Sequence, residues 1–144
     1  MRKAIALGFA PLALFALLLA TAPGAMAEPP QDPGGERCPV CGTPPGGVRF
    51  VVEGEDGTRT VYACPRCAFQ SLDPGTVRRA VATDFLSRET VDARKAFYLR
   101  NTSYGACCPP FWLSFASRED AEKFARGFGG KVLDYEAAVA LFRK

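Results

Sequence analysis

The stretch Val48–Cys67, VRFVVEGEDGTRTVYACPRC, decides the fold that we expect for this chain. Two runs rich in β-branched and aromatic residues flank Glu55-Asp56-Gly57, and Asp-Gly between such runs is a strong β-hairpin signal. We therefore expect one strand over Val48–Glu53 and its partner over Thr58–Ala63. This hairpin organises the sequence on both of its sides.

Two Cys-x-x-Cys pairs flank the hairpin, in the pattern Cys38-x2-Cys41-x22-Cys64-x2-Cys67. A hairpin brings its ends together, so the four thiols can converge on one tetrahedral site like that of a zinc ribbon. Pro65 suits the first position of a helix, and the free amides at a helix start stabilise thiolates. The pattern predicts a soft metal ion, either Zn(II) or Cu(I). Disulfides and a thiol–disulfide redox centre are the alternatives.

A further thiol pair, Cys107-Cys108, lies between two expected strands. Such a pair can bind a soft ion, take part in thiol exchange, complete a site from the other half of the chain, or remain a pair of buried loop thiols. The chain has six Cys and no His, which excludes Ser-His-Asp and Cys-His hydrolases and imidazole-bound zinc. Its formal net charge of +3 is too small to indicate a nucleic-acid partner. We expect a metal-binding protein that is not an enzyme.

The amino terminus has the pattern of an export signal. A basic start precedes an apolar run over residues 4–22, and Ala25-Met26-Ala27 fits a signal-peptidase site. We expect residues 1–27 to be a signal peptide and the protein to be periplasmic or otherwise extracytoplasmic. Membrane attachment is expected only if this segment is not cleaved. Residues 28–37 are rich in Pro and Gly and are expected to form a flexible linker.

The second half of the chain is expected to repeat the strand–strand–helix–strand order of the first. Ser117 and Asp120 form a capping box for a helix that ends at Gly129-Gly130. The remaining elements of the two halves are a helix from Cys64 to about Leu72 and a final helix after Asp134, with strands at Arg79–Phe85, Thr90–Leu99, Phe111–Phe115 and Lys131–Leu133. Nearby acids, Asp84 among them, are expected on a solvated face.

The predicted fold class is therefore α+β, with two small ββαβ lobes. The first lobe is expected over residues 38–86 and contains the zinc-ribbon-like Cys hairpin. The second is expected over residues 87–144 and adds the C-terminal helix.

Several motifs after residue 84 resemble the NosL family, the accessory proteins of nitrous oxide reductase. The resemblance is specific in the second half and looser in the first. The matching residues are Asp84-Phe85, Val91-Asp92-Ala93, Ala96-Phe97-Tyr98-Leu99, Trp112–Phe115 and Asp120-Ala121-x-x-Phe124-Ala125-x-x-x-Gly129-Gly130-x-Val132-Leu133.

The resemblance implies an exported Cu(I)-binding protein that helps to deliver copper to a copper enzyme such as nitrous oxide reductase. It also implies two ββαβ lobes similar to part of organomercurial lyase. Family members usually have Cys and Met ligands and a lipobox Cys, whereas this chain lacks the lipobox Cys and has only thiols at the ligand positions. The expected ligands are Cys38, Cys41, Cys64 and Cys67, with Cys107 and Cys108 assisting. A structural four-thiolate zinc module and an exported thiol–disulfide protein remain the alternatives.

Overall fold

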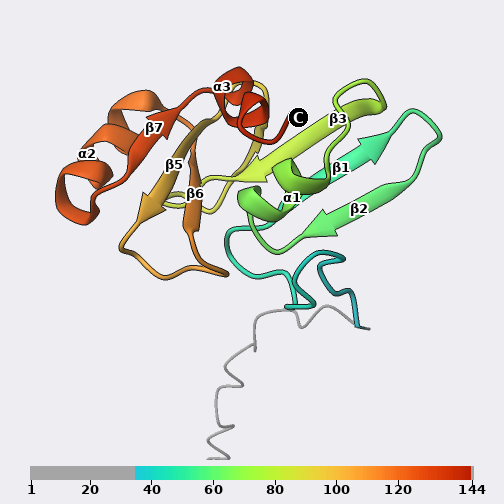
Figure 1. Cartoon of the computed structure of the whole chain (residues 1–144), viewed down its shortest axis with the longest axis horizontal. Coiled ribbons are helices and arrows are strands. Elements are labelled where there is room, and N and C mark those ends of the chain that lie inside the picture. Colours follow the sequence, from blue (N-terminus) through green and yellow to red (C-terminus); the bar gives the residue numbers. More distant parts are fainter. Residues whose placement is uncertain (1–34, 144) are drawn as a thin grey trace, which may run out of the picture. The chain divides into compact units, whose positions relative to one another are not determined.

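The computed structural model describes residues 35–143, and the expected signal peptide and most of the linker lie outside the described residues. The described part contains two antiparallel sheets and three helices (Figure 1). Its elements are β1 (Phe50–Gly54), β2 (Arg59–Tyr62), α1 (Pro65–Ser71), β3 (Val77–Thr83), β4 (Thr90–Asp92), β5 (Phe97–Thr102), β6 (Phe111–Phe115), α2 (Arg118–Phe128), β7 (Lys131–Leu133) and α3 (Tyr135–Ala140).

The first sheet has the strand order β2-β1-β3-β4. The predicted hairpin forms its centre, and the tight turn is possible because Gly57 adopts a φ of 82°. Phe50 lies opposite Tyr62 on one neighbouring strand and opposite Ala82 on the other, and all three are buried. Alternate residues of β1 therefore face the core. The residues between them, such as Val51, lie on the outer face of the sheet.

The second sheet has the order β6-β5-β7, and α2 packs against all three of its strands. Helix α2 begins as predicted, because the Ser117 hydroxyl accepts the backbone N–H of Asp120 at 3.1 Å. It ends at Gly129, whose φ of 68° favours glycine. The α+β fold with two small sheets is thus confirmed.

The two sheets share one hydrophobic core. The ring of Phe69, on α1, contacts Phe50 of the first sheet at 5.4 Å between centroids. The same ring contacts Tyr98 and Trp112 of the second sheet at 4.8 and 5.8 Å. Burying several aromatic rings together removes a large apolar area from water. Helix α1 is therefore held firmly between the sheets, and two of the cysteines lie at its start.

The expected strand Thr90–Leu99 is divided in the structure. Its first part is β4, which pairs with β3 in the first sheet, and its last part is β5 in the second sheet. A turn separates them because the carboxylate of Asp92 accepts the backbone N–H of Arg94 at 2.9 Å. The division into lobes at residues 86 and 87 stays a prediction, with β4 joining the first sheet from beyond that boundary.

Two further features qualify the expectations from sequence. The side chain of Asp84 is only 4% exposed, so its expected place on a solvated face is wrong. Its carboxylate accepts backbone N–H groups of Ser87 and Ala116 at 2.7 and 2.8 Å, which explains how a charged group is buried there.

Among the described residues, no helix has the length and apolar character needed to cross a bilayer.

Candidate metal centre

The first Cys-x-x-Cys pair lies in the loop that precedes β1. The backbone N–H of Gly42 donates to the carbonyl of Cys38 at 2.8 Å, and the N–H of Cys38 donates to Thr43 at 3.1 Å. Gly42 has a φ of 69°, a conformation that glycine adopts without strain. This tight turn buries Cys38 and leaves Cys41 half-buried, with both thiols held on one short segment.

The second pair lies at the start of α1. Cys64 is the residue that precedes the helix, Pro65 occupies the first helical position, and Cys67 is in the first turn. Cys64 and Cys67 are 1% and 0% exposed, and their sulfur atoms are 3.6 Å apart. The expected helix start is confirmed, and it holds two buried thiols within the shared core.

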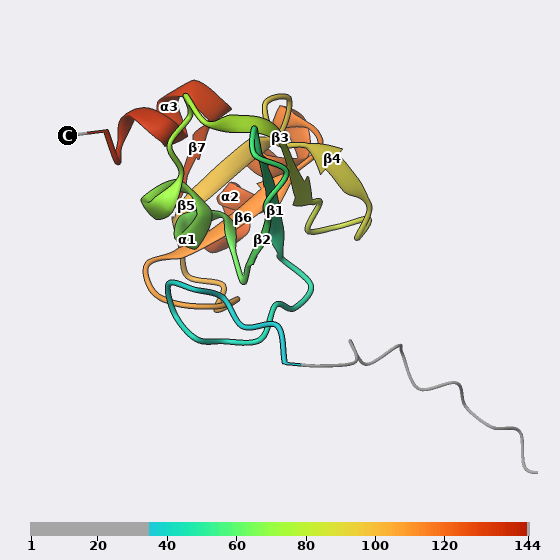
Figure 2. The same ribbon diagram turned by 90° about the vertical axis from the view of Figure 1, so that its right-hand side faces the viewer.

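The thiols of Cys107 and Cys108 come from the loop between β5 and β6. That loop lies beside the loop that precedes β1, as both ribbon views show (Figures 1 and 2). The sulfur of Cys107 is 4.0 Å from that of Cys41, and the sulfur of Cys108 is 3.4 Å from that of Cys67. Three segments far apart in the sequence therefore bring their thiols together.

The spacing of the sulfur atoms fits a soft metal ion. A tetrahedron with metal–sulfur bonds of about 2.3 Å has edges of about 3.8 Å. The sulfur–sulfur distances between these neighbouring thiols run from 3.4 to 4.0 Å. The ligand atoms of Cys41, Cys67, Cys107 and Cys108 all lie within 4.8 Å of one another. This four-sulfur set differs from the four cysteines of the two Cys-x-x-Cys pairs.

All six cysteines are free thiols in the structure. Cys64 lies outside the four-sulfur set but is 3.6 Å from Cys67 and 3.8 Å from Cys108. Cys38 also lies outside the set, and it shares the tight turn of the first Cys-x-x-Cys pair with Cys41. The structure thus brings all six predicted ligands into one cluster, which we call the six-thiol cluster. Their assignment as metal ligands stays a prediction.

The thiols of this cluster differ in acidity. Burial acts to raise the pKa of Cys41, but hydrogen bonds from the Thr43 hydroxyl and backbone outweigh it and lower the pKa to about 6. Burial raises the pKa of Cys64, Cys67 and Cys107, and the negative charge of neighbouring thiolates adds to this effect. A bound cation would supply the positive charge that lets those buried thiols ionise.

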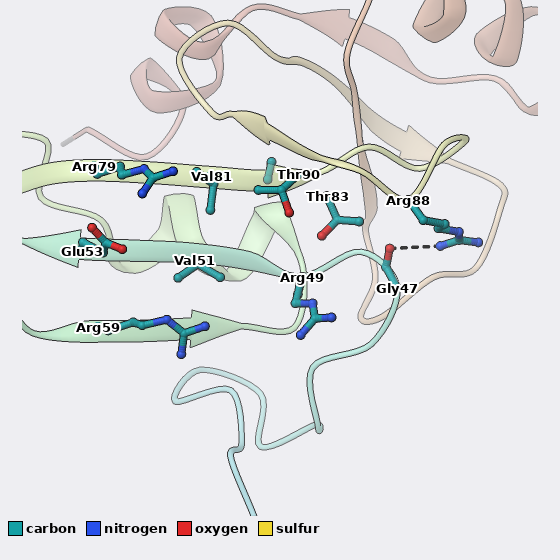
Figure 3. Close-up of a pocket in the computed structure, with 11 residues that line it drawn as sticks. Gly47, Arg49, Val51, Glu53, Arg59, Arg79, Val81, Thr83, Arg88 and Thr90 are labelled. Carbon is teal, nitrogen blue, oxygen red and sulfur yellow. Dashed lines mark hydrogen bonds between the residues drawn. The ribbon is translucent and has the colours of Figure 1, made fainter. Parts of the chain in front are cut away.

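Sequence reasoning missed two features around this cluster. Thr43 was not singled out, although its hydroxyl and amide set the acidity of Cys41. A cavity of about 450 Å³ on the outer face of the first sheet was also missed (Figure 3). Four arginines line it, and strand register brings two of them opposite Glu53 on neighbouring strands. They are Arg49, Arg59, Arg79 and Arg88.

This arginine-lined cavity lies outside the six-thiol cluster but is adjacent to it. A second cavity, of about 190 Å³, shares Gly47 and Arg88 with the first and reaches Cys107. The Arg88 guanidinium donates to the carbonyl of Gly47 at 3.0 Å and so holds the boundary between them. The cavity that reaches Cys107 is therefore lined by one cationic side chain, that of Arg88.

A match to the NosL family spans residues 62–139, more than half of the chain. The chain belongs to the NosL family. The match contains Cys64, Cys67, Cys107 and Cys108, whereas Cys38 and Cys41 lie before its first residue. Two of the three segments that form the six-thiol cluster are thus part of the NosL region.

Two further proteins are similar to this chain. The HTH-type transcriptional repressor CutR of Bacillus subtilis (strain 168) is 35% identical over 79 residues, which are 53% of this chain and 42% of the repressor. The chain thus matches less than half the length of that relative. The crystal structure of the copper chaperone NosL from Shewanella denitrificans has a TM-score of 0.60 at 21% identity, over 75% of this chain and 96% of that one. At this identity, the likeness shows a shared NosL fold.

Proposed function

We propose that this NosL-family protein is an exported Cu(I) chaperone that holds copper by thiolates alone and passes it to a copper enzyme. The observation that supports this most directly is the convergence of six free thiols in a NosL fold. Thiolates favour soft ions such as Cu(I), and no His is present to offer an imidazole. The sequence composition and the geometry of the site thus favour the same chemistry.

Ligand exchange is the transfer mechanism that we propose. Cys38, Cys64 and Cys67 are buried, whereas Cys41, Cys107 and Cys108 are half-buried. Cu(I) accepts two or three thiolates, so a ligand of the acceptor can join the ion from the half-buried side before a thiolate of the chaperone leaves. The thiolate of Cys41, with its lowered pKa, is a weaker base than its neighbours and is therefore the easiest to displace. No bond of a substrate is made or broken, so the proposed activity is not enzymatic.

The proposed partner is an exported copper enzyme such as nitrous oxide reductase. This proposal rests on the NosL membership and on the signal-peptide pattern of residues 1–27. We propose a periplasmic or other extracytoplasmic location, with membrane attachment only if that signal segment is retained. Nucleic acid is not among the proposed partners.

Metal analysis and competition test this function. Protein purified without chelators would be titrated anaerobically with Cu(I) against bathocuproine disulfonate, and Cu(I) transfer to a copper-free acceptor would be followed by absorbance. We expect Cu(I) to bind in preference to Zn(II) and to be released to the acceptor. Stoichiometric zinc that Cu(I) does not displace would refute the chaperone proposal.

A structural zinc module is the second candidate, and the four-sulfur set of Cys41, Cys67, Cys107 and Cys108 favours it. Four sulfur atoms within 4.8 Å of one another match the closed four-thiolate arrangement of structural zinc sites. On this hypothesis, chelation would unfold the protein, because structural zinc contributes on the order of 10 kcal/mol to folding. Circular dichroism before and after chelation distinguishes the candidates, since a chaperone must remain folded when it has released its cargo.

A further inference from the structure

We infer that the six-thiol cluster binds at least two Cu(I) ions together, in two adjacent three-thiolate sites. The inference rests on the proposed Cu(I)-binding function and goes beyond it, because one ion would suffice for a chaperone. It starts from the number of thiols. One four-coordinate ion uses four sulfurs, which leaves two thiols of the cluster without a ligand role.

The two thiols outside the four-sulfur set are placed as ligands. Cys38 and Cys64 are 2% and 1% exposed, so neither is a surface thiol that happens to lie nearby. Cys64 lies beside Cys67 and Cys108 of the set, and Cys38 shares a tight turn with Cys41 of the set. A second ion is the simplest use for two buried sulfurs that neighbour different members of the four-sulfur set.

Three of the sulfurs form a nearly regular triangle. The sides Cys64–Cys67, Cys64–Cys108 and Cys67–Cys108 are 3.6, 3.8 and 3.4 Å. A trigonal ion with metal–sulfur bonds of about 2.3 Å needs sides of about 4.0 Å. Outward shifts of a few tenths of an ångström therefore convert this triangle into a three-thiolate site, which we call the inner site.

The remaining three sulfurs form the outer site. The sulfur of Cys41 is 4.0 Å from that of Cys107, a separation that already matches a trigonal site. Cys38, which is buried in the same tight turn as Cys41, completes the group. Cys41 and Cys107 are both half-buried, so an ion here is nearer to solvent than one in the inner site.

The two sites adjoin each other closely enough to share ligands. Cys107 of the outer site and Cys108 of the inner site are consecutive, and their sulfurs are 3.6 Å apart. Cys41 and Cys67 also lie within 4.8 Å of each other across the boundary. A thiolate has several lone pairs, so one sulfur can bridge two Cu(I) ions.

Charge also favours more than one ion. Several of these thiols are buried and adjacent, and ionising them around a single monovalent cation would leave a large negative charge away from water. Each further Cu(I) reduces that charge by one. Each thiol that becomes a ligand gives its proton to the buffer, and copper stays Cu(I), so loading needs no oxidant or reductant. We expect the outer ion to be exchanged first, because its ligands are the more exposed.

Stoichiometry tests this inference directly. Full-length reduced protein would be titrated anaerobically with Cu(I) and measured by native mass spectrometry, and copper X-ray absorption would report a short copper–copper distance. We expect two or more Cu(I) per chain, a copper neighbour in the absorption spectrum, and one Zn(II) per chain in a parallel zinc titration. A single Cu(I) per chain that is still transferred would overturn the inference and leave the proposed function intact. No tight Cu(I) binding would overturn both.

Cys64→Ser and Cys38→Ser form a matched pair of variants, because each removes one buried thiol and leaves the four-sulfur set intact. We expect both to bind one Zn(II) as the wild type does, which also shows that they are folded. We expect both to lose one Cu(I) and the copper–copper signal. Unchanged Cu(I) stoichiometry in either variant would refute the assignment of that thiol. Loss of Zn(II) as well would refute the four-sulfur set as the zinc site, and with it the premise that Cys38 and Cys64 are left over for a second ion.

Discussion

Removal of the Thr43 hydroxyl should make the Cys41 thiol markedly less acidic. In the metal-free protein, hydrogen bonds from Thr43 are the main cause that lowers the pKa of Cys41 to about 6, against the opposing effect of burial. At pH 7 such a thiol is about nine-tenths ionised, whereas an ordinary cysteine with a pKa of about 8.5 is about 3% ionised. Thr43→Val keeps the shape and the backbone donor but removes the hydroxyl, so we expect the pKa to rise towards the ordinary value.

The assay must report the pKa and not the rate of reaction at one pH. A thiolate of low pKa is less nucleophilic, and this offsets much of the gain in its population at pH 7. Reduced, metal-free protein would therefore be alkylated with iodoacetamide from pH 4.5 to pH 10, with each cysteine followed by peptide mass spectrometry. We expect Cys41 to give a midpoint near pH 6 in the wild type and a higher midpoint in Thr43→Val.

Thr43→Ser is the matched control, since it keeps the hydroxyl and should leave the Cys41 midpoint low. Cys64, Cys67 and Cys107 are internal references, because burial raises the pKa of each and their alkylation should need a higher pH. A wild-type midpoint above pH 8 for Cys41, or equal midpoints in the three proteins, would refute the role of the Thr43 hydroxyl.

Three further predictions concern stability, each measured by urea unfolding of the metal-free protein. Phe69→Ala should lower the free energy of unfolding by about 3–5 kcal/mol, because that ring contacts both sheets. Phe69→Leu should lower it clearly less, and equal small losses in the two variants would contradict a shared core. Hydrogen bonds hold the pKa of Asp84 below its usual range despite burial. The contribution of the ionised Asp84 carboxylate to the free energy of unfolding should therefore be complete above about pH 4 and lost as the pH falls through the lowered pKa. Asp84→Asn should cost about 1–3 kcal/mol at pH 7 and weaken that acid sensitivity, and an unchanged acid transition would contradict this role. Gly130→Ala should destabilise the protein by about 1–3 kcal/mol, because φ at Gly130 is 106° and an added Cβ would lie 2.7 Å from the Arg100 carbonyl oxygen. Gly127→Ala is the control: this glycine is on a helix with open space around it, so the change should be neutral or stabilising.

Much of the fold was predictable because its signals are local. The Asp-Gly turn, the Pro65 helix start and the Ser117 cap each depend on residues within a few positions, and all three are present in the structure. The break in the expected strand Thr90–Leu99 was not predicted, since the apolar pattern continues through the turn that Asp92 forms. The burial of Asp84 was also missed, because one of its donors is the distant amide of Ala116.

The sequence by itself determined the chemistry available to this protein: six thiols, no imidazole, and two Cys-x-x-Cys pairs around a hairpin. Those features depend only on residue type and on spacing along the chain. Only the tertiary structure decided that Cys107 and Cys108 join the same cluster, because the β5–β6 loop meets the loop that precedes β1 through packing of the two sheets around Phe69. The placing of Arg59 and Arg79 on either side of Glu53, in the cavity on the outer face of the first sheet, depends in the same way on strand pairing. Contacts between distant segments are set by the burial of a shared core, and no local pattern in the sequence specifies which loops that burial brings together.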